Sequence, residues 1–158
     1  MASPHLTALA PRDVLYIRRV RNGQDVRVLA GGLPTVGLWE HLLWYARNAR
    51  EIHRHSFVVI ADGRRAGYIR LGMITGNCAE ISIALEPWAQ GRGIGLHSLT
   101  LATSVYRKRA FPARLMARVH RGNVKSLALF ERAGFVVTMT PTRCKYIFLT
   151  RDLHAPSA

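Results

Sequence analysis

The chain has 158 residues, which suits a single domain with a hydrophobic core of its own. Lys and Arg number 23 against 9 Asp and Glu, and the resulting net charge of +14 favours anionic partners such as nucleic acid, acidic lipid or phosphorylated small molecules. The sequence shows no apolar run long enough to span a membrane, no recognisable signal peptide and no metal-ligand spacing around its two cysteines, so we expect a cytoplasmic protein without a metal centre.

We predict one domain over residues 1–158, with loose tails at 1–4 and 153–158. The basic residues are scattered, and the two densest runs, at 18–21 and 107–109, fit solvated helix faces. Charge alone therefore selects no function. The two cysteines fall in strand-like stretches, where we interpret them as small core thiols.

The first elements are a strand at 6–10 and a helix that opens at Pro11 with Asp13 in its first turn. The apolar residues from Val14 to Val20 fit that helix, although they would also fit a strand. A clearer helix lies within 34–49, where apolar residues recur at helical spacing.

A hairpin follows, because two β-rich runs within 56–74 flank the pair Asp62-Gly63. The next strand, 79–85, alternates strictly. One face carries Ile81, Ile83 and Leu85, and the other carries Glu80, Ser82 and Ala84.

The second half predicts a helix at 96–110, a strand at 113–119, a helix at 123–133 and two strands at 135–139 and 144–150. Gly134 fits the left-handed position that closes a helix, and Phe135 can then fold back on Phe130. This order of elements predicts an α/β fold with a mostly antiparallel start and one parallel crossover in the middle.

Residues 86–96, EPWAQGRGIGL, join a strand to a helix through three glycines. Glycines let backbone N–H groups approach a ligand, and the start of a helix adds unpaired donors and a positive dipole end, so this loop can cradle a pyrophosphate. The spacing is neither a dinucleotide fingerprint, because position 96 is Leu, nor a P-loop, which needs Gly-Lys-Ser/Thr. A tight turn that only lets helix and strand pack is the alternative.

QGRGIG, followed about 30 residues later by NVKSLALFERAGF, resembles the paired motifs of the GNAT acetyltransferase superfamily. The resemblance implies a GNAT fold: a mixed, mostly antiparallel sheet with a splayed parallel pair in its centre, flanked by about four helices. It also implies an N-acetyltransferase that moves an acetyl group from acetyl-CoA to a primary amine.

The resemblance further implies which residues hold the co-substrate. The backbone of Ile83, Ala84 and Leu85 would pair with the pantetheine arm of acetyl-CoA. The pyrophosphate would lie on Gln90, Gly91, Arg92, Gly93, Ile94 and Gly95, and the thiol end would lie near Asn123 and Ser126.

The resemblance also implies that Phe130 belongs to this cofactor site, at a position where many members of the family carry a tyrosine that protonates the leaving thiolate. The alternatives are another group such as Tyr146, water, a slow enzyme, or a domain that binds coenzyme A with little catalysis.

An amine attacks a thioester only when it is neutral, and lysine-like amines titrate near 10.4, so a base must remove a proton, usually through water. Glu80 is our candidate base and Ser82 a candidate for holding that water. Alternatively, Glu80 is a surface carboxylate in an ion pair, and Ser82 is an ordinary polar residue of the strand.

The chain carries VRNGQDVR at 20–27 and EHLLW at 40–44, followed by GYIRL and AEISIAL. These stretches resemble, with Val20 in place of a tryptophan, a GNAT branch that acetylates nucleotide-linked amino sugars in pseudaminic-acid-type pathways. This implies a small, anionic amine as acceptor, with Arg21, Asn22 and His41 as acceptor-site candidates; helix packing and a solvated arginine are the alternatives.

Two other functions share the motifs: a protein N-acetyltransferase acting on an α-amine or lysine, and a module that binds coenzyme A or nucleic acid with little turnover. The sequence has no recognisable nucleic-acid motif. The family makes a homodimer plausible, and no membrane partner is expected.

Overall fold

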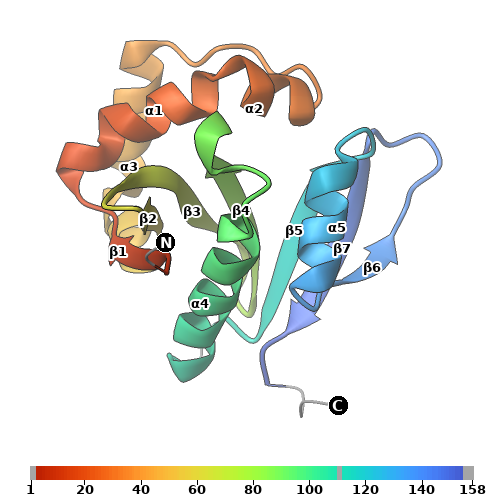
Figure 1. Ribbon diagram of the computed structural model, residues 1–158. Coiled ribbons are helices and arrows are strands. Elements are labelled where there is room, and N and C mark those ends of the chain that lie inside the picture. Colours follow the sequence, from red (N-terminus) through yellow and green to blue (C-terminus); the bar gives the residue numbers. More distant parts are fainter. Residues whose placement is uncertain (1–2, 110–111, 155–158) are drawn as a thin grey trace.

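One seven-stranded sheet with strand order β1-β2-β3-β4-β5-β7-β6 forms the centre of the computed structural model, which describes residues 3–109 and 112–154 except the side chains of 53, 73 and 74 (Figure 1). The strands are β1 (His5–Ala8), β2 (Phe57–Ala61), β3 (Arg64–Thr75), β4 (Cys78–Leu85), β5 (Arg114–His120), β6 (Val136–Met139) and β7 (Tyr146–Asp152). The helices are α1 (Val14–Asn22), α2 (Gln24–Leu29), α3 (Leu38–His55), α4 (Ile94–Lys108) and α5 (Val124–Arg132), with short 3-10 helices η1 (Pro11–Asp13) and η2 (Pro87–Ala89).

The sheet is antiparallel except between β4 and β5, which run parallel. These two strands pair at just three positions, from Cys78 opposite Arg114 to Glu80 opposite Met116. Beyond that point they separate, and Figure 1 shows the two halves of the molecule forming a V. The predicted mixed α/β sheet with a splayed parallel pair is confirmed.

The hairpin between β2 and β3 is confirmed as well. Asp62 and Gly63 both have positive φ, 49° and 73°, as a two-residue turn of this kind requires. The helix α5 ends as predicted: Gly134 has φ of 83°, and the Phe135 N–H donates to the Phe130 carbonyl at 3.0 Å while the two rings pack edge to face.

Two hydrophobic clusters lie on opposite faces of the sheet. The larger one packs α4 and α5 against β4 and β5, and it receives Ile81 and Leu85 from β4. The smaller one packs α1 and α3 against β2 and β3, and it receives Ala84. The predicted alternation of β4 is therefore confirmed, because its two faces enter different clusters.

Several boundaries differ from the sequence prediction. The helix predicted from Val14 is confirmed, but α2, whose six residues include no buried one, was not predicted, so five α-helices are described where about four were expected. Cys144 lies in the loop before β7, and both cysteines are half-buried rather than in the core. Leu153 is buried and donates its N–H to Ala113, so the expected C-terminal tail is wrong at that position; the predicted end of the fourth helix, residue 110, lies outside the described residues.

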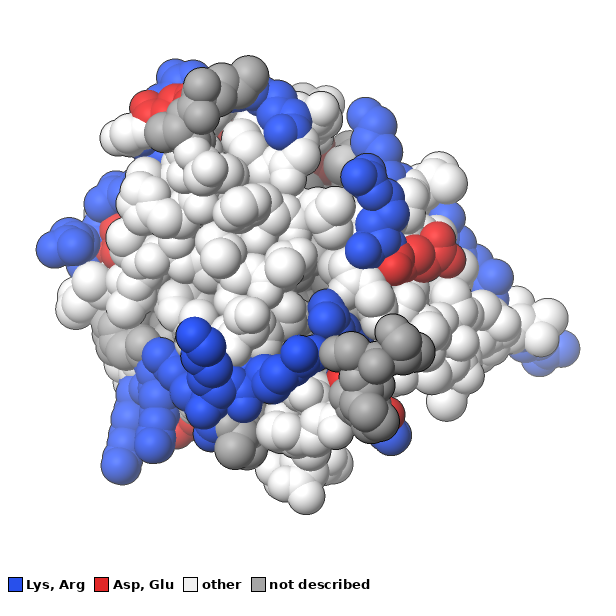
Figure 2. Space-filling model, turned by 60° about the horizontal axis from the view of Figure 1, so that its bottom comes forward, with Lys and Arg blue, Asp and Glu red and all other residues white. Residues whose placement is uncertain are grey.

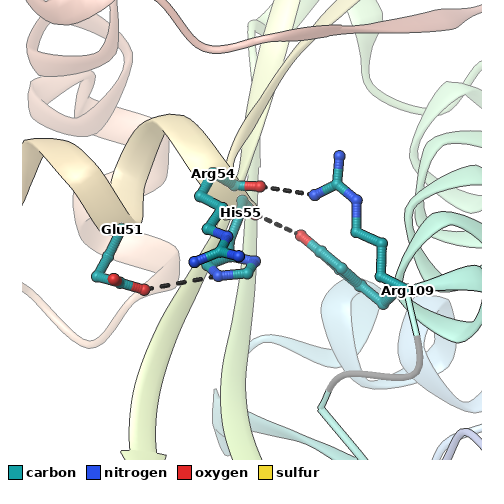
Figure 3. A network of polar contacts seen from close by, with 5 residues as sticks. Glu51, Arg54, His55 and Arg109 are labelled. Atoms are coloured by element: carbon teal, nitrogen blue, oxygen red, sulfur yellow. Dashed lines mark hydrogen bonds and ion pairs between the residues drawn. The ribbon is translucent and has the colours of Figure 1, made fainter.

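The C-terminal end of α3 is fixed to the C-terminal end of α4 (Figure 3). Arg109 donates from Nη1 to the carbonyl of Arg54 at 2.6 Å, and the buried hydroxyl of Tyr106 donates to the carbonyl of His55, also at 2.6 Å. Both acceptors are carbonyls of the last turn of α3, which have no partner within their own helix. Burial raises the pKa of Tyr106 above its ordinary value, so the hydroxyl keeps its proton.

Basic side chains collect at this same end of the molecule. Arg107, Lys108 and Arg109 are exposed at the end of α4, as the sequence predicted for that run. Figure 2, which brings the bottom of the molecule forward, shows Lys and Arg in a band with few carboxylates. Among the helices described, none is long and apolar enough to cross a membrane.

We expect Tyr106→Phe to lower the free energy of unfolding by about 1–3 kcal/mol, because it leaves the buried His55 carbonyl without its donor. Tyr16→Phe is the matched control: the Tyr16 hydroxyl is also buried, but it has no hydrogen-bond partner in the described structure. Removing it should leave the free energy of unfolding unchanged or raise it. Urea unfolding of both variants measures the difference, and equal losses would contradict the role assigned to Tyr106.

Candidate active site

The open edge of β4 offers main-chain groups to the gap between β4 and β5. The Glu86 N–H donates to the Ala66 carbonyl at 2.8 Å, which fixes the phase of the β3–β4 ladder. Even-numbered residues of β4 therefore bond to β3, and the N–H and C=O groups of Ile81, Ile83 and Leu85 face β5. Since β5 pairs no further than Glu80, Ile83 presents its main chain to the gap.

The neighbouring positions differ from Ile83. Ala84 bonds to β3 through its main chain, and its side chain is buried in the smaller cluster, so it offers no main-chain group to the gap. The Leu85 carbonyl does face the gap, but it accepts a hydrogen bond from Nε2 of Gln90 at 3.2 Å. Gln90 thus links the end of β4 to the glycine loop.

The glycine loop borders open space. Gly91 and Gly93 have φ of 71° and 76°, and a Cβ added at either would meet no atom within 4 Å. Gly93 is the N-cap residue of α4, so the first N–H groups of that helix have no partner within it. A diphosphate fits this arrangement, because the loop leaves room for it and supplies donors at the positive end of a helix.

The remaining residues of the loop have other contacts. Arg92 forms an ion pair with Asp62 at 2.8 Å, and both border a hollow of about 260 Å³ beside Gly93, Ile94 and His97. The side chain of Ile94 is buried, and a Cβ on Gly95 would approach Leu129 and Leu85 at 3.3 Å. Ile94 and Gly95 therefore hold α4 against its neighbours, and their main chain is what remains for a ligand.

The second motif forms the start of α5. Asn123 caps this helix by accepting the Ser126 N–H at 3.0 Å through its side-chain oxygen. Phe130 is buried against Phe135, so its ring belongs to the core. No polar group from position 130 reaches the gap.

Glu80 lies at the base of the V, on the face opposite α4. It shares this face with Ser82, with Arg70 of β3, which pairs with Ser82, and with Arg118 of β5. Oε1 of Glu80 lies 3.5 Å from Nε of Arg118, and the carboxylate is 29% exposed. The ion pair considered from sequence is thus present, on a carboxylate that solvent can still reach.

A turn after α2 covers part of this face. The hydroxyl of Tyr146 donates to the Ala30 carbonyl at 3.4 Å, and its ring lies edge-on to His120, with centroids 5.8 Å apart. His120 also sits against Gly31, where an added Cβ would come within 2.7 Å of the imidazole. Neither His120 nor this turn could be predicted from the sequence, because both depend on a contact between the two halves of the chain.

The three acceptor-site candidates fall into two groups. Asn22 exchanges two hydrogen bonds with the main chain of Val36, at 2.9 and 2.8 Å. His41 is buried, donates from Nε2 to the Val14 carbonyl at 2.9 Å and lies against Trp44; burial lowers its pKa, so the ring is neutral at pH 7. These two residues hold α1 to α3 and its preceding loop.

Arg21 is the third candidate and has no such structural contact. It is half-buried, and its Nη1 atom is fully covered without a hydrogen-bond partner in the described structure. The sequence suggested that the run at 18–21 is a solvated helix face. The structure corrects this, because Arg18 donates to the Val36 carbonyl and Arg19 pairs with Glu86. Across the described residues, no three His, Cys, Asp or Glu side chains gather as a metal site would require.

A family model described as the acetyltransferase (GNAT) family matches residues 27–135, which is more than half of the chain. No curated protein sequence gives a significant match.

Solved structures of similar fold include the spermidine N-acetyltransferase of Vibrio cholerae with CoA and spermine (21% identity, TM-score 0.82, 96% of each chain covered). Another is the ribosomal L7/L12 α-N-protein acetyltransferase RimL with coenzyme A (16%, 0.82, covering 99% of this chain and 97% of that one). A third is AAC(6')-Ib with paromomycin and acetyl-CoA (15%, 0.79, 96% and 94%). Since all three identities are low, they support the fold.

We expect Gly93→Asp to abolish the rise in melting temperature that coenzyme A produces, because it places a carboxylate where the diphosphate would lie. Gly134→Asp is the control for backbone strain: Gly134 has a similar φ of 83° but closes α5, away from the loop. Both variants should lose stability without ligand. Thermal melts of both variants with and without coenzyme A measure this rise. An undiminished rise in Gly93→Asp would exclude the glycine loop as the diphosphate site.

Proposed function

This chain belongs to the acetyltransferase (GNAT) family, and from that premise we propose that it acetylates the primary amine of a small molecule whose other groups are uncharged or anionic. An amino sugar or a nucleotide-linked amino sugar is such a molecule. The enzyme uses acetyl-CoA as its acetyl donor. The identity of the acceptor and the roles of individual residues are the proposal.

The unpaired edge of β4 beside the glycine loop is the observation that carries the proposed transfer from acetyl-CoA, because it is where the acetyl donor would lie. The Ile83 carbonyl would accept a hydrogen bond from an amide of the pantetheine arm, and the main chain from Gly91 to Gly95 would hold the diphosphate. Asn123 and Ser126, at the start of α5, would line the opposite side of the arm.

Acetyl-CoA supplies a thioester carbonyl that a neutral amine can attack. Glu80 accepts the proton of the amine through a water molecule, and Ser82, the next residue on that face, helps to hold this water. Arg118 restrains the Glu80 carboxylate at the base of the V. The Ile83 N–H, directed into the gap, stabilises negative charge that develops on the carbonyl oxygen.

The leaving thiolate receives its proton from water. Phe130 has no proton to give, and the Tyr146 hydroxyl is engaged with Ala30. A thiol has an ordinary pKa near 8.5, so the thiolate is a good leaving group that needs little help.

Charge favours neutral or anionic acceptors over polyamines. Arg70 pairs with Ser82 across the β3–β4 ladder and Arg118 contacts Glu80, so arginine side chains border the proposed acceptor face. A polycation such as spermine, the ligand of the Vibrio cholerae enzyme, would be repelled from such a site.

A protein substrate is the second candidate, because the chain aligns with RimL over 99% of its length. Thiol-release assays should compare amino sugars, nucleotide-linked amino sugars, spermidine and peptides with free α-amines or lysines. We expect turnover of the sugars and none of spermidine. Turnover of peptides alone would establish the protein acetyltransferase instead.

Glu80→Gln should lower kcat/KM at least tenfold at pH 7 and by less at pH 9, where more of the amine is already neutral. Glu131→Gln, an exposed carboxylate on α5, is the control and should have the wild-type profile. Steady-state thiol release across this pH range measures both. Equal losses at both pH values would exclude Glu80 as the base.

A further inference from the structure

We infer that Arg21 and Arg70 form an anion-binding subsite beside the catalytic face, which holds a carboxylate or phosphate group of the acceptor. This inference rests on the proposed function, since it concerns the molecule that receives the acetyl group. It assigns the acceptor a defined chemistry: a primary amine and an anionic group in one compact molecule.

Arg70 lies directly beside the proposed catalytic residues. It pairs with Ser82 across the β3–β4 ladder, so its side chain leaves the same face of the sheet as Glu80. The guanidinium lies over the Trp44 ring of α3, 5.4 Å from its centroid. Residues 80 and 82 are about 7 Å apart along the strand, which is the scale of a monosaccharide.

Arg21 approaches the same region from α1. Its guanidinium and that of Arg70 both act on the buried hydroxyl of Tyr68, the residue two before Arg70 on the same face of β3. Burial raises the pKa of Tyr68, while the two positive charges partly oppose this effect. Val20, the residue before Arg21, packs in the smaller cluster with Tyr68 and Trp44. Arg70 lies over that Trp44 ring, so both arginines border one cluster between α1, α3 and β3.

No carboxylate side chain neutralises this pair. All nine Asp and Glu residues lie in the described ranges, and five of them pair with other arginines. These pairs are Arg19–Glu86, Arg65–Asp13, Arg92–Asp62, Arg114–Asp152 and Arg118–Glu80. Neither Arg21 nor Arg70 has an acidic partner among the described residues, although both are half-buried.

A half-buried guanidinium without a counter-charge is costly, and the covered Nη1 of Arg21 also lacks an acceptor. The other half-buried arginines, Arg18, Arg27 and Arg151, donate to main-chain carbonyls. Arg21 and Arg70 have no such acceptor in the described structure, so they mark a place where a ligand can supply the negative charge. Arginine suits the task because its planar donors bind carboxylate and phosphate groups in a bidentate manner.

The kinetic test uses three acceptors that share one amine: glucosamine, glucosamine 6-phosphate and 2-amino-2-deoxyglucuronic acid. We expect wild-type kcat/KM to be at least tenfold higher for an anionic sugar than for glucosamine. The better of the two anionic sugars identifies phosphate or carboxylate as the group. Arg21→Gln and Arg70→Gln should reduce this preference at least tenfold, through KM.

Arg132→Gln is the matched control, because Arg132 is exposed at the end of α5 and should keep the full preference. Equal losses for charged and neutral sugars in the Arg21 and Arg70 variants would overturn the subsite. So would a wild-type enzyme that does not distinguish the three sugars.

A binding test separates failure of the subsite from failure of the proposed function. With coenzyme A saturating, so that the glycine loop is filled, inorganic phosphate or malonate is titrated at constant ionic strength and the melting temperature is recorded. Wild type and Arg132→Gln should gain several degrees, and Arg21→Gln and Arg70→Gln should not. Equal gains in all four proteins would exclude the subsite even if no sugar is acetylated.

Discussion

The structure depends on the shortness of the pairing between β4 and β5. Three residue pairs join the two halves of the sheet, and everything above Glu80 on β4 is left without a strand partner on that side. A full ladder would satisfy the main chain of Ile83 and Leu85 and close the V. Because the ladder stops, the main chain of Ile83 is left without a strand partner next to the glycine loop, and a ligand of extended shape can take the place of the missing strand.

Much of this arrangement could be predicted from sequence because its signals are local. The alternation of residues 79–85, the Asp62-Gly63 turn and the glycines before α4 each reflect the conformation of a few neighbouring residues. Contacts between distant segments could not be predicted in this way. The ion pair of Glu80 with Arg118, the engagement of Arg92 by Asp62 and the packing of His120 under Gly31 all join residues at least 30 positions apart. The helix α2 was missed because none of its six residues is buried, so it carries no strong apolar pattern.

The positive charge has a more specific meaning in the structure than in the sequence. Several arginines donate hydrogen bonds to main-chain carbonyls of other elements. Arg18 bonds to the loop before α3, Arg109 to the C-terminal end of α3, and Arg121 to two carbonyls of the β6–β7 loop. Others have carboxylate partners. What remains around the proposed acceptor site is a small excess of buried positive charge, and this excess, rather than the total of +14, bears on the choice of substrate.

At the edge of the sheet formed by β6, the side chains of Val136, Val137 and Met139 are exposed. A long, flat edge strand in this position would let strands of other molecules pair with it and so promote aggregation. Here the strand has four residues, and its register with β7 shifts between Val137 and Met139. This irregularity disfavours continuous stacking of sheets, so the fold can keep an open border at its centre for ligand and an apolar one at its rim while resisting aggregation.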